Sequence, residues 1–374
     1  MRNFELEIFF SEWEFKAKYH LTASDMESMS MKDLLAMAND EDREAFENLW
    51  LGYTQTYGLP ALRTEIAGTY DNLEDQDILC FAGAEEGLYT AMQSILTPDD
   101  HAIIIVPNYQ AAETIPLNIC DATGIPLQAD NGWALDIEAI AGALRPNTKL
   151  ISINFPNNPT GKIISHDELD ALVNLAREFD IYIFSDEVYR GIELDESKRI
   201  SQIADVYEKG LSLNVMSKAY GLPGLRIGWI ACQDRELLQS MERFKHFLTI
   251  CNSGPSEILS LIALRSRDKI LKRNKNILID NVEKLDKFFG EFPEIFEWTR
   301  PDGGAVAYPK YLLGDNCNQF CQDLLEKTGV MILPPRIYNS DLLATPQNHF
   351  RVGFGRSGMD EMLDKFYHYL KKNG

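Results

Sequence analysis

Residues 214–229 read NVMSKAYGLPGLRIGW, and they place a lysine between two apolar segments. The segment before Lys218 (LSLNVM, 211–216) and the segment after the turn (RIGWIAC, 226–232) are typical of buried strands. An ordinary solvated charge does not belong between two such strands. We therefore expect Lys218 to have a function that depends on its position.

The chain around this stretch alternates between short apolar runs and helix-like segments. The runs include AIIIVP (102–107), KLISINF (149–155) and IYIFSD (181–186), and amphipathic segments such as HDELDALVNLAREF (166–179) lie between them. This alternation predicts an α/β fold, with a mostly parallel sheet sandwiched by helices. From residue 256 the strands become fewer, which indicates a smaller α+β domain. We expect a large domain over 45–255 and a small domain formed by 1–44 and 256–374.

The composition of the 374 residues excludes several classes of partner. A net charge of −21 argues against binding to nucleic acid and to anionic membranes. The sequence shows no apolar run long enough to span a membrane and no secretory signal, so a cytoplasmic location is expected. The six scattered cysteines are interpreted as structural thiols rather than as metal ligands or disulfides, and no metal site is predicted.

Polar side chains follow the predicted strands at the edge of the sheet where ligands usually bind. Ala84 and Glu85 open a helix after a strand, so their free backbone N–H groups could bind an anion. Tyr109 could offer an aromatic surface to a flat ligand, although packing is the alternative. Asn158 lies in PNNPTG (156–161), which is either a structural turn or the source of an amide for the site.

The next two strands end in ionisable residues. Asp186 and then Tyr189 follow the run 181–184, and Ser217 and Lys218 follow 211–216, with Arg226 eight residues further on. A buried carboxylate can keep a ring nitrogen protonated, and a partly dry amine can act as nucleophile and base. Together these groups suit a flat, phosphorylated, protonatable ring that carries an aldehyde. That description predicts pyridoxal 5′-phosphate as the cofactor.

The chain resembles the fold-type I pyridoxal-phosphate enzymes of the class I/II aminotransferase family. The resemblance extends from about residue 50 to the end of the chain. It rests on the type, order and spacing of five motifs: YTQTYGLPALRTEIA (53–67), NFPNNPTG (154–161), SDEVY (185–189), SKAYGLPGLRIGW (217–229) and FRVGFGRS (350–357).

The resemblance implies a role for each candidate residue. Lys218 would form the Schiff base with the cofactor and shuttle the proton, and Asp186 would bind the pyridine nitrogen. The remaining cofactor contacts would come from Tyr189, Asn158, Tyr109, Ala84, Glu85 and Arg226. Tyr53 would reach the phosphate of a neighbouring subunit, which implies a homodimer with shared active sites. Arg351, with Asn158, would bind the carboxylate of the amino acid or 2-oxo acid.

Two departures from the family pattern leave alternatives open. Val215 stands where a phosphate-binding serine is usual, and Ser217 is a possible substitute. The segment HLTASDMESMSM (20–31) lacks the usual Gly-x-Pro pattern and contains Asp25 and Glu27. These acids either begin a helix or receive a cationic substrate side chain. The alternative function is that of a lyase or cyclase acting on a polar or basic amino acid, as in capreomycidine synthase.

Overall fold

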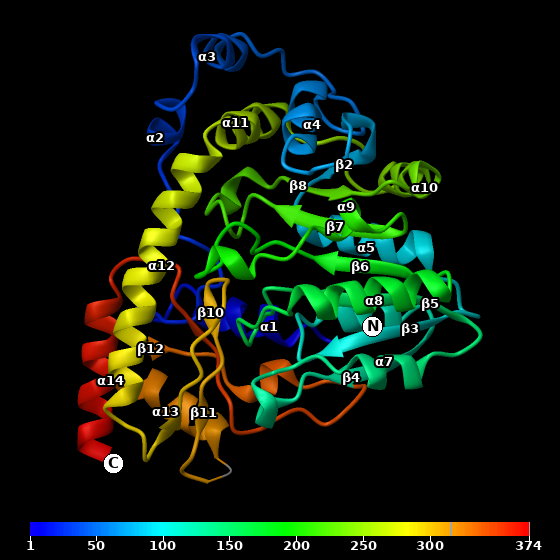
Figure 1. The fold of residues 1–374 in the computed structure, drawn as a ribbon. Coiled ribbons are helices and arrows are strands. Elements are labelled where there is room, and N and C mark those ends of the chain that lie inside the picture. Colours follow the sequence, from blue (N-terminus) through cyan, green and yellow to red (C-terminus); the bar gives the residue numbers. More distant parts are fainter. Residues whose placement is uncertain (315, 374) are drawn as a thin grey trace.

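The computed structural model describes residues 1–314 and 316–373, which fold around one seven-stranded sheet (Figure 1). The strands of this sheet are β2 (Ile78–Phe81), β3 (His101–Val106), β4 (Asp121–Pro126), β5 (Thr148–Asn154), β6 (Tyr182–Asp186), β7 (Gly210–Val215) and β8 (Gly228–Ala231). The helices that pack on it include α5 (Ala84–Ile95), α6 (Ala111–Leu117), α7 (Ile137–Ala143), α8 (His166–Glu178), α9 (Ile203–Val206) and α10 (Arg235–Lys245).

The strands lie in the order β2-β8-β7-β6-β5-β3-β4. The five strands from β7 to β4 are parallel to one another, and β8 is antiparallel to both of its neighbours. The α/β fold with a mostly parallel sheet is therefore confirmed. Because parallel strands end at the same edge, the loops after β5, β6 and β7 meet there.

The apolar strands are buried on both faces because successive side chains point to opposite sides. In β3, Ala102 and Ile104 face the hydrophobic core under α5 and α6, whereas Ile103 and Ile105 face the core under α7 and α8. In Figure 1, α7 and α8 lie in front of the sheet and α5 lies behind it. This two-sided burial explains the continuous apolar runs in the sequence.

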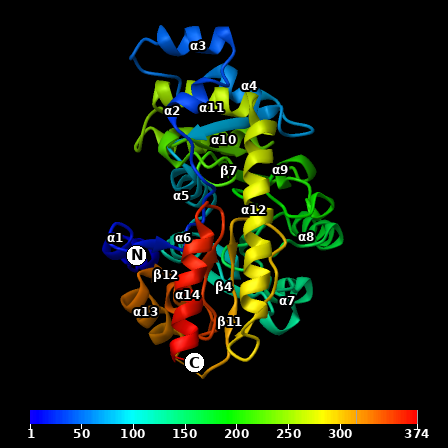
Figure 2. The same cartoon turned by 90° about the vertical axis from the view of Figure 1, so that its left-hand side faces the viewer.

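The long helix α12 (Arg267–Gly290) follows α11 (Gly254–Arg265) and runs from the sheet to the smaller elements of the C-terminal part (Figure 2). These elements are β9 (Phe296–Glu297), β10 (Val306–Ala307), β11 (Lys310–Tyr311), α13 (Cys317–Thr328), β12 (Val330–Met331), β13 (Val352–Gly353) and α14 (Met359–Asn373). Short pairs form between β9 and β11 and between β10 and β13.

The N-terminal segment contacts both parts of the molecule. It contains α1 (Glu5–Trp13), β1 (Tyr19–His20), α2 (Met31–Leu35) and α3 (Asp40–Glu47), and α4 (Pro60–Ala67) follows. β1 pairs with β12, whereas α2 and α3 contact α11. The domain boundaries expected at residues 44 and 255 stay a prediction.

Within the described residues, no helix is long and apolar enough to cross a membrane. The same residues contain no group of three or more His, Cys, Asp or Glu side chains that could hold a metal ion. All six cysteines are free thiols, including Cys317 and Cys321 one turn apart on α13.

Gly353 allows β13 to lie directly against the N-terminal segment. Its N–H donates to the carbonyl of Leu21 at 3.0 Å, and a Cβ added at Gly353 would lie 2.0 Å from the carbonyl oxygen of Ala23. Because that obstacle is backbone, Gly353→Ala should lower the free energy of unfolding by about 1–3 kcal/mol in urea titration. Gly142→Ala, where nothing lies within 4 Å, is the matched control and should not be destabilising. Equal stability of the two variants would contradict this packing argument.

Candidate active site

A cavity of about 460 Å³ lies at the carboxyl ends of β5, β6 and β7. Ten of the residues predicted from the sequence line it: Asp25, Ala84, Glu85, Tyr109, Asn158, Asp186, Tyr189, Ser217, Lys218 and Arg226. Two predicted residues do not line it. Arg351 is fully buried beside Asn158, and Tyr53 is 92% exposed on the outside of the chain. The topology of the sheet therefore brings together residues from five separate strand ends.

The Lys218 side chain is half-buried, and its amine faces the cavity just after the end of β7. Its Nζ donates a hydrogen bond to Ser24 Oγ at 2.8 Å. Burial lowers the pKa of the amine, and the charges of Asp25 and Asp186 oppose this effect. The lowered pKa increases the neutral fraction, and only a neutral amine is a nucleophile.

Asp186 is the last residue of β6 and faces the same cavity. Burial raises its pKa to about 6, although the N–H of Val188 (3.2 Å) and the charge of Lys218 favour the ionised form. Tyr189 is also buried, and its hydroxyl lies near Ser24 but makes no hydrogen bond of ordinary geometry. A phenol without a full partner in a polar cavity is suited to a ligand oxygen.

The PNNPTG turn is held in place by its own asparagines. Asn157 Oδ1 accepts hydrogen bonds from the N–H and the hydroxyl of Thr160. The N–H of Asn158 donates to Asn154 Oδ1 at 2.7 Å, and Asn154 also donates to the carbonyl of Asp186. The segment 156–161 is therefore both a structural turn, held by its internal hydrogen bonds, and a turn that places Asn158 at the cavity.

Several groups that could hold an anion lie where α5 begins. Gly83, with φ of +103°, precedes the helix, and a Cβ added there would lie 2.4 Å from Nη2 of Arg226. Arg226 Nη1 donates to Ser217 Oγ at 3.3 Å, and no carboxylate pairs with this arginine among the described residues. Free N–H groups and an unpaired guanidinium fit a phosphate group. Val215 contributes only an apolar surface to this wall.

Glu85 lies beside these anion-binding groups, where a charged carboxylate would repel a phosphate. Burial, and then the charges of Glu7 and Asp186, raise the pKa of its carboxyl to about 7. This shift reduces the negative charge next to a phosphate, and because the Glu85 side chain also reaches solvent, its remaining charge is screened. The amine, carboxyl, phenol and anion-binding groups thus fit pyridoxal phosphate.

Arg351 is a buried cation whose described hydrogen bonds all go to neutral oxygen atoms. Nη1 donates to Tyr338 Oη at 2.7 Å and to Asn158 Oδ1 at 3.1 Å, and Nη2 donates to the carbonyl of Thr22 at 2.8 Å. Its Nε is buried without a partner. A buried charge without a counter-ion is costly, so this site would be stabilised by an anionic ligand.

The two acids of the N-terminal segment already have partners. Both carboxylate oxygens of Asp25 accept from Arg356 Nη2, at 2.9 and 2.8 Å. Glu27 accepts from the N–H and hydroxyl of Ser357, each at 2.8 Å. Asp25 is therefore engaged by Arg356 rather than free to receive a substrate cation.

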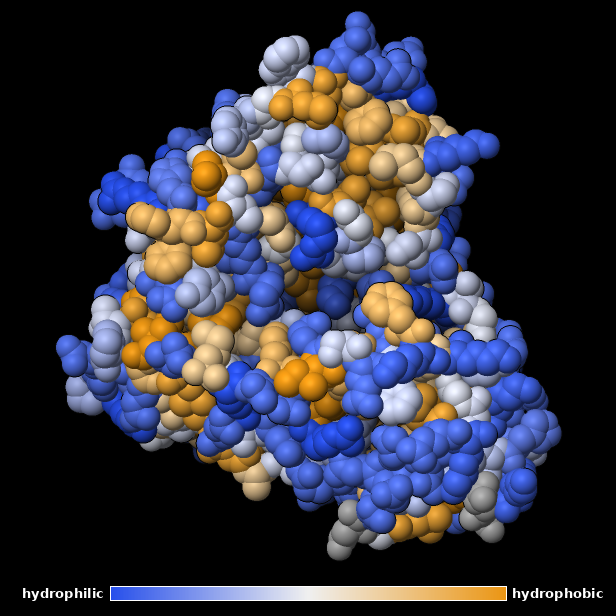
Figure 3. Space-filling view, turned by 180° about the vertical axis from the view of Figure 1, so that it is seen from behind, coloured by the Kyte–Doolittle hydropathy of each residue, from blue (hydrophilic) through white to orange (hydrophobic). Residues whose placement is uncertain are grey.

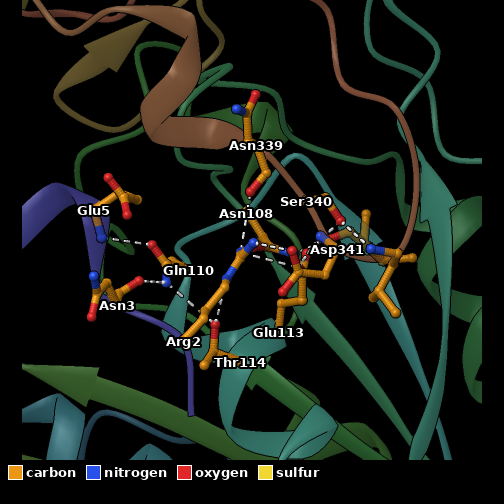
Figure 4. A network of polar contacts seen from close by, with 12 residues as sticks. Arg2, Asn3, Glu5, Asn108, Gln110, Glu113, Thr114, Asn339, Ser340 and Asp341 are labelled. Atoms are coloured by element: carbon orange, nitrogen blue, oxygen red, sulfur yellow. Dashed lines mark hydrogen bonds and ion pairs between the residues drawn. The ribbon is translucent and has the colours of Figure 1, made fainter.

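Helix α1 forms an outer wall of the cavity. A network of polar contacts fixes its first residue, Glu5, and the segment just before it (Figure 4). Arg2 Nη2 donates to the buried Glu113 at 3.1 Å, and Gln110 accepts from the N–H of Glu5 at 3.0 Å. Glu113 also accepts from the N–H of Asp341 at 2.8 Å. The α1 residues at the cavity are Leu6, Glu7 and Phe10, with Glu14 just after the helix.

Sequence reasoning missed four residues that contact the predicted ones: Ser24, Asn154, Tyr338 and Arg356. Asn154 and Arg356 belong to the quoted motifs NFPNNPTG and FRVGFGRS, so their position at or just after the end of a strand was a usable signal. No sequence signal pointed to Ser24 or to the α1 residues at the cavity, because the N-terminal segment meets the sheet only through tertiary contacts.

Comparison with known proteins identifies the family. The sequence model of "Aminotransferase class I and II" matches residues 16–370. Aspartate aminotransferase of Pyrococcus horikoshii is 27% identical over 301 residues, 78% of this chain and 76% of that protein. Capreomycidine synthase of Streptomyces vinaceus is 24% identical over 356 residues, 93% of this chain and 88% of that protein. A crystal structure of a PLP-dependent aminotransferase from Streptococcus suis shares 29% identity with a TM-score of 0.92 and covers 99% of this chain and 98% of its own.

The family match spans nearly the whole chain, so the chain belongs to the class I and II aminotransferases. The family resemblance in the motifs is confirmed. The cofactor is pyridoxal 5′-phosphate, and the activity is transfer of an amino group between an amino acid and a 2-oxo acid.

The raised pKa of Asp186 makes a prediction for the cofactor-free protein. Because its native pKa of about 6 exceeds the ordinary value of 3.8, folding favours the protonated form. The stabilisation that comes from the protonated carboxyl is fully present below pH 3.8 and is lost as the pH rises through 6. At pH 8 the ionised Asp186 therefore lowers the free energy of unfolding by about 3 kcal/mol. Asp186→Asn should therefore stabilise the cofactor-free protein by about 2–3 kcal/mol at pH 8 and by about half of that at pH 5.

Chemical denaturation at the two pH values measures both effects. Asp170→Asn on the exposed side of α8 is the control, and its stability should stay within about 0.5 kcal/mol of wild type. A destabilised Asp186→Asn protein at pH 8 would show that the carboxylate is not isolated in the native state.

Proposed function

We propose that Lys218 is the amine that joins the cofactor and then moves the substrate proton, with Asp186 at the ring nitrogen. The observation that carries the proposal is the placement of a half-buried amine and a buried carboxylate in one cavity, beside groups suited to phosphate. Tyr189 and Asn158 would contact the ring hydroxyl, and Tyr109 would stack on the ring. Ala84, Glu85, Ser217 and Arg226 would surround the phosphate.

Bound pyridoxal phosphate supplies an aldehyde carbon that amines attack and an electron-withdrawing ring that stabilises negative charge at the substrate Cα. The protein supplies the proton transfers. Lys218 Nζ, kept partly neutral by burial, would remove the Cα proton and later return it to the cofactor side. Ionised Asp186 would keep the ring nitrogen protonated. Ser24 would hold the Lys218 amine in position through the hydrogen bond at 2.8 Å.

Arg351 is proposed to bind the α-carboxylate of both substrates. Support comes from its lack of a carboxylate partner and from its hydrogen bond to Asn158, which lines the cavity. A substrate carboxylate would supply the missing counter-charge. Arg356 also faces the cavity, but Asp25 already neutralises it.

A homodimer in a cytoplasmic setting is proposed as the working form. Trp50 (89%), Tyr53 (92%) and Phe247 (90%) are strongly exposed for aromatic residues. The face opposite to α7 and α8 carries several hydrophobic areas around a hollow (Figure 3). Exposed apolar surface of this kind favours contact with a second copy. In such a dimer Tyr53 would complete the phosphate site of the other subunit.

A second candidate function keeps the cofactor and changes the outcome to elimination or cyclisation of a polar or basic amino acid. It is favoured by the similarity to capreomycidine synthase, which extends over 93% of this chain. The aminotransferase structure from Streptococcus suis covers 99% of this chain at 29% identity, which supports amino-group transfer as the first candidate. The two functions differ in whether a 2-oxo acid is needed as co-substrate.

One assay separates these functions. The holoenzyme is incubated with a panel of amino acids, with and without 2-oxoglutarate. We expect a new 2-oxo acid and an equal amount of glutamate, only when 2-oxoglutarate is present. Ammonia or a cyclic product without the co-substrate would support the second function. Lys218→Ala should form no product and lack the visible absorbance of the bound cofactor, and wild-type turnover by this variant would refute the role of Lys218.

Arg351→Lys tests carboxylate binding. The shorter, single-point ammonium cannot reproduce two guanidinium hydrogen bonds, so KM for the amino acid should rise about 10- to 100-fold. The cofactor spectrum should be unchanged. Steady-state kinetics of Arg356→Lys provide the comparison, because that residue is paired with Asp25. A larger KM increase in Arg356→Lys than in Arg351→Lys would reverse the assignment.

A further inference from the structure

Lys245, the last residue of α10, is fully buried outside the cavity. Its Nζ donates to the carbonyls of Thr56 and Cys80, each at 2.8 Å, and to Asn252 Oδ1 at 3.2 Å. Lysines are rarely buried without a purpose, and here all three donors of the ammonium have an acceptor. None of the acceptors is a carboxylate. The hydrogen bonds therefore go to chain segments, which they hold together.

The segments joined by Lys245 are two surface loops and the end of β2. Thr56 belongs to the loop 50–59, Asn252 to the loop 246–253, and Cys80 to β2. Further hydrogen bonds reinforce the same junction. Thr54 Oγ1 donates to the carbonyl of Asn252 at 2.9 Å, and Asn252 Nδ2 donates to the buried Glu257 at 3.0 Å.

The loop 50–59 is consequently fixed along most of its second half. Glu257 Oε1 accepts the N–H of Leu59 at 3.2 Å, and the N–H of Cys80 donates to the carbonyl of Tyr57 at 2.9 Å. Gly58, with φ of +107°, lies against Cys80, where a Cβ would approach to 2.8 Å. A loop held this closely presents its remaining residues in one arrangement.

Trp50, Leu51 and Tyr53 are the strongly exposed apolar residues of this loop, and Tyr53 lies nearest to its fixed part. It directly precedes Thr54, is 92% exposed and does not line the cavity of its own chain. Fixing such a side chain beforehand reduces the entropy lost when it binds. The neighbouring loop held by the same lysine carries the exposed Phe247.

We propose that Lys245 is a positioning residue that fixes the loop 50–59, so that Tyr53 completes the phosphate site of the second subunit. The inference rests on the proposed homodimer and on the proposed contact of Tyr53. It predicts that loss of Lys245 weakens the cofactor site of the other subunit, not the site of the chain that carries the substitution.

The first experiment measures the dissociation constant of pyridoxal phosphate for the dimer of Lys245→Met, by absorbance titration. We expect it to rise at least about tenfold, because the hydrogen bond of Lys245 to Thr56 in the loop is lost together with its bonds to Cys80 and Asn252, against which the loop is held. Lys272→Met, at an exposed position on α12, should bind the cofactor as wild type does. If Lys245→Met does not fold, Thr54→Val keeps Lys245 but removes the separate hydrogen bond from Thr54 to the carbonyl of Asn252, and it should raise the constant about threefold. Wild-type affinity in the folded variant would overturn the inference.

A mixed dimer separates an effect on the neighbour from an effect within the chain. One subunit carries Lys218→Ala, and the other carries Lys245→Met with its Lys218 intact. The only complete site then receives Tyr53 from the subunit with an intact Lys245. We expect wild-type cofactor affinity at this site. A dissociation constant as weak as that of the Lys245→Met homodimer would show that Lys245 acts within its own chain and would refute the proposal.

Failure of the positioning role of Lys245 can be told apart from failure of the proposed cofactor role of Lys218. If wild-type protein formed no visible chromophore with pyridoxal phosphate, the role of Lys218 would be wrong. If the wild type bound the cofactor and Lys245→Met did so equally well, only the positioning role would be refuted. Tyr53→Phe in the wild-type background should weaken the cofactor by a similar factor, and no change would refute the contact through which Lys245 is proposed to act.

Discussion

The burial of two ionisable groups in one cavity is the constraint on which the rest of the site depends. Burial lowers the pKa of Lys218 and raises the pKa of Asp186, so each group is driven towards its neutral form. Neither effect is fully offset by hydrogen bonds among the described residues, since the Lys218 amine donates one to Ser24 and the Asp186 carboxylate accepts one from Val188. A protonated ring and an aldehyde would use both groups, which is the physical reason that this cavity suits its cofactor.

The sheet supplies this constraint through its topology. β5, β6 and β7 are parallel neighbours, so Asn154, Asp186 and Val215 end at the same edge. The N-terminal segment then crosses this edge and adds Ser24 and the carbonyl of Thr22. One side of the site is therefore rigid because it belongs to the sheet. The other side depends on a segment held by contacts such as Arg2–Glu113 and Gly353–Leu21.

The acidic residues near the cavity show why charge alone does not reveal specificity. Asp25 and Glu27 suggested a subsite for a cationic substrate, but Arg356 and Ser357 satisfy them. Arg351, in contrast, has no carboxylate partner within residues 1–314 and 316–373, and its hydrogen bonds there go to neutral acceptors. An unpaired buried charge is the more informative feature, because it is costly unless a ligand completes it. Lys245 differs from both, since its charge is satisfied by backbone and amide oxygens.

The sequence by itself determined the class of fold, the order of the strands along the chain and the residues at their ends. Apolar runs of strand length predict strands that are buried on both faces of the sheet. Polar residues directly after these runs indicate the edge of the sheet where a ligand binds. Only the tertiary structure decided which charges are paired, where α1 lies and that Lys245 joins two loops. Those features arise between segments as far apart as Lys245 and Thr56, or Asp25 and Arg356. Such contacts leave no periodic trace in either segment, because they depend on the folded path of the whole chain.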